Sequence, residues 1–91
     1  MALARETSRT YDFNLAAVIV SIQDEFGITV PHTIHLMNVN VCPVCQSRKL
    51  LDVNGNVDVD ATVAQIITAT DAANATLRQK FIAAGWSPTS P

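Results

Sequence analysis

The feature that most limits the fold is a long segment with a helical period, DATVAQIITATDAANATLRQKFIAAG, residues 60–85. Asp58 or Asp60 is suited to cap its start, and Gly85 is suited to end it. At a rise of 1.5 Å per residue, the segment predicts a helix about 37 Å long. Its apolar and small side chains recur every three or four residues and form one stripe: Val59, Val63, Ile66, Thr70, Ala73, Leu77, Phe81 and Ala84.

A second, shorter helix is predicted over residues 12–26, DFNLAAVIVSIQDEF. Apolar residues at Leu15, Val18, Ile19, Ile22 and Phe26 fall on one helical face. Gly27 is suited to the left-handed residue that follows a helix. The β-branched run at 18–20 weakens helix propensity, which leaves a buried strand as the alternative.

The long helix is longer than any partner that this chain is expected to offer. The shorter predicted helix covers only part of its stripe, and the alanines in its middle permit close approach of another helix. We therefore expect residues 59–84 to dock on a second copy of the chain or on a larger assembly.

The part of the chain between the two predicted helices is rich in strand formers. Residues 28–41 alternate apolar and polar side chains, the period of a strand with one drier face. Pro31 confines the start of this strand to a sheet edge or a bend. Further on, Asn54-Gly55 between two short apolar runs predicts a hairpin turn.

These elements predict an α+β fold, in which two helices pack on a small β-hairpin or sheet. A chain of 91 residues is one domain at most. The expected organisation is an extended arm over residues 1–11, a single domain over residues 12–85, and a short tail over residues 86–91 that Trp86 anchors.

Both histidines and both cysteines lie in the short segment HTIHLMNVNVCPVC, residues 32–45. They form two pairs with two intervening residues each, His32 with His35 and Cys42 with Cys45. Structural zinc sites commonly use two such short-spaced pairs of Cys or His. The segment therefore predicts a zinc site whose ligands are these four residues.

The segment VCPVCQSRKLLDVNGNV, residues 41–57, resembles the first half of a zinc ribbon, a knuckle followed by a turn, a strand, an NG turn and a strand. The resemblance implies zinc bound by Cys42 and Cys45. Two departures stand out. The chain has DVDAT where the second cysteine pair of a ribbon would follow, and Gln46 where the first knuckle usually has glycine.

The remaining ligands stay open at the level of sequence. His32 and His35 converge on one ion only if PHTIH makes a turn, because a regular strand would direct them to opposite faces. Asp52, Asp58 or the cysteine pair of a second subunit are alternatives. The cysteines themselves also fit a redox pair or buried thiols without metal.

Composition excludes several classes of function. The net charge is −2 and there are two lysines, so the chain lacks the basic face that binds nucleic acid or an anionic membrane. Apolar runs are too short to span a bilayer. A secretory signal is not visible, and a reducing, cytoplasmic setting is expected, or a virion if the protein is viral.

The sequence favours a small non-catalytic interaction subunit that zinc stabilises. No convergent set of catalytic groups is visible, so an enzyme is not expected. The short chain with little lysine is typical of phage structural or accessory proteins. The alternatives are a zinc-containing regulatory protein that contacts nucleic acid or the transcription machinery, which Arg48 and Lys49 motivate, and a CxxC thiol oxidoreductase.

Overall fold

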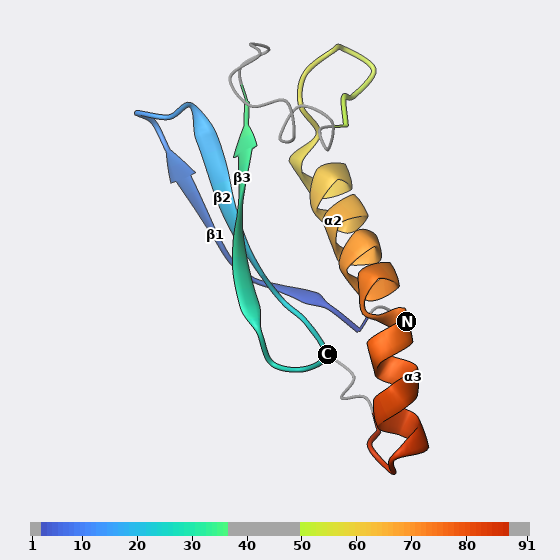
Figure 1. Ribbon diagram of the computed structural model, residues 1–91. Coiled ribbons are helices and arrows are strands. Elements are labelled where there is room, and N and C mark those ends of the chain that lie inside the picture. The colour runs from blue at the N-terminus through green and yellow to red at the C-terminus, as the bar shows by residue number, and fades with distance from the viewer. Residues whose placement is uncertain (1–2, 37–49, 88–91) are drawn as a thin grey trace.

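The computed structural model describes residues 3–36 and 50–87 of the chain. Three antiparallel strands lie in the order β1-β2-β3 and span Arg5–Asp12, Ala17–Gln23 and Thr29–His35. Two helices follow, α2 over Val59–Ala73 and α3 over Ala75–Ala83. The helices lie on one side of the sheet, one after the other (Figure 1). This arrangement confirms the α+β class, whereas the predicted knuckle lies outside the described residues.

The central strand β2 corrects the prediction of a helix over residues 12–26. Val18, Val20 and Ile22 are all buried, so the buried side chains repeat every second residue. The β-branched run is the physical reason, because branched side chains lose rotamer freedom in a helix and pack well on a pleated sheet. The alternative of a buried strand is therefore the observed one.

Residues 5–12 form an edge strand of the sheet, not the predicted arm outside the domain. β1 pairs antiparallel with β2 from Arg5 opposite Gln23 to Asp12 opposite Ala17. The pairing register shifts between Glu6 and Ser8. The prediction that the domain begins at residue 12 is wrong, because the sheet includes this earlier segment.

A tight turn joins β2 to β3 and uses the glycine that the helix prediction had placed at a helix end. Gly27 has a φ of 88°, in the left-handed region. Asp24 Oδ1 accepts hydrogen bonds from the backbone N–H groups of Phe26 and Ile28, at 2.9 and 3.0 Å. A left-handed glycine serves a hairpin turn as well as a helix end, so Gly27 alone does not distinguish the two.

The strand predicted within residues 28–41 is present as β3, which is the second edge of the sheet. Pro31 lies opposite Ser21 in the middle of β3. Proline lacks the N–H of a ladder and is confined to positions of this kind, so the predicted edge position is confirmed. The part of that prediction beyond Leu36 lies outside the described residues.

The long predicted helix is confirmed from its cap to its end, with a break at Asn74. Asp58 is the N-cap, and its side chain accepts from Ala61 N. Gly85 (φ 103°) follows the helix, and Trp86 N donates to Phe81 O at 2.9 Å, a Schellman-type ending. The stripe of α2 packs on the sheet instead of a second helix. The core consists of Ala4, Val18, Val20, Ile22, Ile34, Val63 and Ile66.

The Asn54-Gly55 turn before α2 is also confirmed. Leu51 and Val57 form an isolated antiparallel bridge, and Gly55 has a φ of 83°. Thr62 in the first turns of α2 is buried and accepts from Leu50 N at 3.1 Å, which ties this loop to the helix. Among the helices in the described ranges, none is long and apolar enough to cross a membrane.

Candidate functional site

The two predicted histidine ligands do not form a convergent pair. Both lie on β3, where His32 is opposite Val20 and His35 is opposite Ala17. Side chains three residues apart in a strand point to opposite faces of the sheet. The turn that would bring them to one ion is therefore not formed. Cys42 and Cys45 lie outside the described residues, so zinc binding at the cysteines stays a prediction.

The two aspartates considered as further metal ligands have local structural roles. Asp52 Oδ1 accepts from the backbone N–H groups of Asn54 and Asn56, at 2.8 and 3.0 Å. Asp58 Oδ1 accepts from Ala61 N at 3.0 Å as the cap of α2. Within residues 3–36 and 50–87, no group of three or more His, Cys, Asp or Glu side chains is placed to hold a metal ion.

α3 carries a group of half-exposed apolar side chains. Leu77, Phe81 and Ile82 are exposed to 46%, 43% and 40%. α3 has no buried residue among its described positions, whereas α2 buries Thr62, Val63 and Ile66. Leu77 and Phe81 of the long stripe are therefore half-open to solvent, although the element that covers the rest of the stripe is the sheet and not the predicted shorter helix.

An aromatic cluster connects this surface to the turn between β2 and β3. Phe26 from the turn lies 5.4 Å from Phe81 and 5.3 Å from Trp86, measured between ring centroids. The Phe81 and Trp86 rings are 5.8 Å apart. These distances are within the range of favourable aromatic pairs. Trp86, which is expected to anchor the C-terminal tail, packs on Phe26 and Phe81, whereas residues 88–91 of that tail lie outside the described residues.

A buried ion pair lies beside the aromatic cluster. Arg78 Nε and Nη2 donate to the two carboxylate oxygens of Glu25, at 2.5 and 3.0 Å. The Glu25 side chain is 0% exposed and that of Arg78 is 16% exposed. Hydrogen bonding to Glu25 raises the pKa of Arg78 above its ordinary value. The two-point contact fixes the orientation of α3 as well as its distance from the turn.

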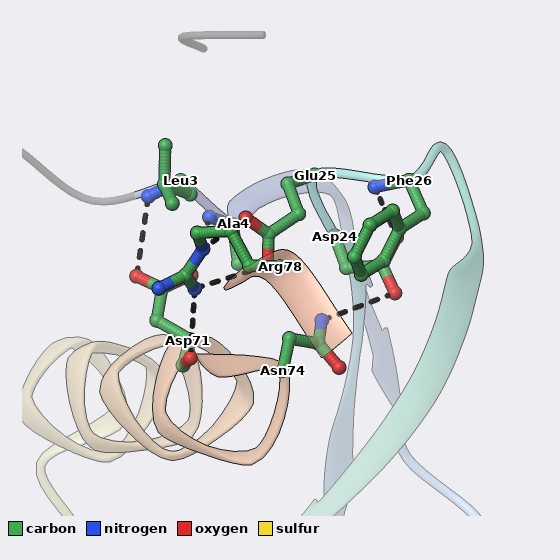
Figure 2. A network of polar contacts seen from close by, with 8 residues as sticks. All are labelled: Leu3, Ala4, Asp24, Glu25, Phe26, Asp71, Asn74 and Arg78. Carbon is green, nitrogen blue, oxygen red and sulfur yellow. Dashed lines mark hydrogen bonds and ion pairs between the residues drawn. The ribbon is translucent and has the colours of Figure 1, made fainter. Parts of the chain in front are cut away.

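The same region holds the N-terminal end of the sheet and the junction of the two helices (Figure 2). The carboxylate of Asp71 accepts from Leu3 N and Ala4 N, at 3.1 and 2.9 Å. Arg78 Nη2 also donates to the backbone carbonyl of Asp71, at 2.8 Å. One residue of α2 thereby connects the start of β1 to the ion pair on α3.

This network positions elements and does not offer a reactive group to a substrate. The Glu25 carboxylate is completely covered and both of its oxygens accept from Arg78. A general base must reach the proton that it removes, which a sequestered carboxylate cannot do. The Glu25–Arg78 pair is therefore a structural contact between the turn and α3.

Sequence reasoning did not find the ion pair. Arg78 lies 53 residues away from Glu25 in sequence. No local pattern links positions so far apart, so only the packing of the helix against the turn reveals the pair.

A second group of exposed apolar side chains lies at the other turn of the sheet. Tyr11, Phe13 and Leu15 are exposed to 60%, 99% and 53%, and Leu36 at the end of β3 is exposed to 38%. Tyr11, Phe13 and Leu36 line a shallow surface depression together with Ala16 and Ala17. This second group provides a matched comparison for the surface on α3.

Comparisons with protein-family models, with curated proteins and with solved structures find no match for this chain.

Proposed function

We propose that this protein is a small, non-catalytic interaction subunit that docks through α2 and α3, on a second copy of itself or on a larger assembly. The observation that carries the proposal is the difference in burial along one continuous stripe. α2 buries Val63 and Ile66 of the stripe on the sheet, whereas Leu77 and Phe81 of the stripe remain 46% and 43% exposed, and the neighbouring Ile82 is 40% exposed. Half-exposed apolar side chains gathered on one element are typical of association surfaces.

The charge of this surface is compatible with a protein partner. Arg78 is held by Glu25, so its charge is compensated within the chain. Lys80 remains as the basic residue in the last turn of α3. A nucleic acid partner would require several basic side chains on one face, and the chain has six lysines and arginines against eight acids.

Zinc remains part of the proposal only through Cys42 and Cys45. The histidine pair does not fit as half of a site, because the two side chains lie on opposite faces of β3. If Cys42 and Cys45 bind zinc, the coordination shell of the ion needs further ligands that the histidine pair does not supply together. Zinc would then hold the segment that connects β3 to the loop before α2.

The test is native mass spectrometry of the full chain, with and without a chelator. A dimer or larger species is expected if the chain self-associates, and a mass increase that the chelator removes is expected if zinc binds. A monomer at all concentrations would leave docking on a different partner and would contradict self-association.

Two matched variants locate the surface. Leu77→Ser places a hydroxyl on α3, and Phe13→Ser places the same group on an exposed apolar position at the other turn of the sheet. We expect Leu77→Ser to dissociate the dimer or larger species and Phe13→Ser to leave it intact. The reverse result would move the docking surface away from α3.

A further inference from the structure

α3 depends on contacts outside itself to remain helical. It has nine residues and no buried side chain among the residues that the structure describes. Isolated helices shorter than about 12–15 residues are marginal in water, because nucleation is costly. α2 differs, because it has fifteen residues and buries Val63 and Ile66 in the core.

The contacts that hold α3 converge on one turn. Arg78 binds Glu25, and Phe81 packs on Phe26, which is the next residue of the same turn. Trp86, just after the helix, stacks on the same Phe26 ring. A single short segment between β2 and β3 therefore carries both the ionic and the aromatic support of α3.

The boundary between the two helices is a single residue. Asn74 is the C-cap of α2 and the N-cap of α3, with φ −88° and ψ −3°. Its side chain makes no capping bond and instead contacts Asp24 Oδ2 through Nδ2, at 3.5 Å. Hinges are commonly a few residues at the ends of elements, so Asn74 is the position at which α3 can turn relative to α2.

The balance of charges makes the closed position depend on one cation. Arg78 pairs with the Glu25 carboxylate and donates to the backbone carbonyl of Asp71, whereas the Asp24 carboxylate accepts from Asn74 (Figure 2). Without Arg78, the fully covered Glu25 carboxylate would lose its ionic partner. A buried charge without a partner is strongly unfavourable. When α3 moves Arg78 away, water must therefore reach the Glu25 carboxylate at the same time.

We propose that α3 opens as a unit about Asn74 while the sheet and α2 stay folded, and that the Glu25–Arg78 pair controls this opening.

Hydrogen exchange of the unmodified full chain tests the opening directly. Amides of residues 75–83 are expected to exchange at least about tenfold faster than those of residues 62–66, because local opening requires less free energy than loss of the core. Equal protection in the two helices would overturn the proposal, since they would then open together.

The variant Glu25→Gln removes the buried charge with little change of shape. We expect faster exchange in α3, unchanged exchange in α2, and a red shift of the emission of Trp86, the single tryptophan of the chain. Asp60→Asn is the matched control, because it neutralises an acid that pairs with Arg9 but is 86% exposed. It is expected to change neither readout.

Arg78→Lys provides a second route if Glu25→Gln does not fold. Lysine keeps the charge but loses the two-point contact, so α3 alone is expected to loosen. Equal acceleration in α2 and α3, or no acceleration in either, would overturn the proposal.

Discussion

α2 and α3 follow one another along the same side of the sheet, yet different forces hold them. α2 is held by Val63 and Ile66, which pack among Val18, Val20 and Ile22 of β2. α3 is held by one ion pair and one aromatic cluster at the turn between β2 and β3. Burial of apolar area is non-directional and tolerates small shifts, whereas a two-point ion pair fails when either partner moves.

The difference teaches how one helical stripe can serve two purposes. The part over the sheet contributes stability, and the part beyond it leaves apolar side chains half-exposed, available for the association that we propose. Asn74 separates the two parts, so a movement of α3 need not disturb the core.

The largest expected effect is on the α2 side of this comparison. Ile66→Ala should lower the free energy of unfolding by about 2–5 kcal/mol, because it removes buried atoms and leaves a cavity. Ile66 is 4% exposed. Chemical denaturation followed by circular dichroism measures the change.

Leu77→Ala is the matched control for that variant on α3. Leu77 is 46% exposed, so the expected loss is only about 1 kcal/mol. Equal losses at Ile66 and Leu77 would contradict the assignment of the core to α2.

A smaller effect is expected from Thr62→Val in the first turns of α2. The Thr62 hydroxyl accepts from Leu50 N and donates to Asp58 O, at 3.1 and 2.8 Å. The variant leaves the Leu50 N–H without this partner and should cost about 1–3 kcal/mol in unfolding free energy. Thr68→Val, at an exposed hydroxyl bonded to Ala64 O, should stay within about 0.5 kcal/mol. Similar losses in the two variants would argue against a role for Thr62 in fixing the loop.

The smallest effect is expected from Asp60→Asn. This acid pairs with Arg9 Nη1 at 2.9 Å, and the Arg9 guanidinium keeps Glu6 as a second partner. Hydrogen bonds to both acids raise the pKa of Arg9. Exposed pairs contribute about 0–1 kcal/mol, and salt screens them. The melting temperatures of variant and parent should therefore differ little at low salt and at high salt. A much lower melting temperature of the variant at high salt would mean that the pair is not screened as its exposure implies.

The sequence predicts the long helix well because its signals are local. A cap at Asp58, a 3.6-residue period and a left-handed glycine at position 85 all act within a few residues of the chain. The Asn54-Gly55 turn and the edge position of Pro31 were predictable for the same reason.

The sequence misleads where two periods fit the same residues. Val18 and Ile22 belong to a helical stripe and also to an alternating strand, and Gly27 can end a helix or form a hairpin turn. The pairing of β2 with both β1 and β3 selects the strand over the helix. A short stretch of sequence does not contain these two neighbours. The arm predicted at the N-terminus was wrong for the same reason, because β1 is polar and becomes a strand only by pairing with β2.

The candidate site divides along the same line. The sequence by itself determined that an apolar stripe would run along the C-terminal helix, since side-chain spacing is a local property. Only the tertiary structure decided that His32 and His35 separate on a strand and that Glu25 meets Arg78 across 53 residues. Distances between remote residues depend on how the sheet and the helices pack, and that packing is fixed by the whole chain at once.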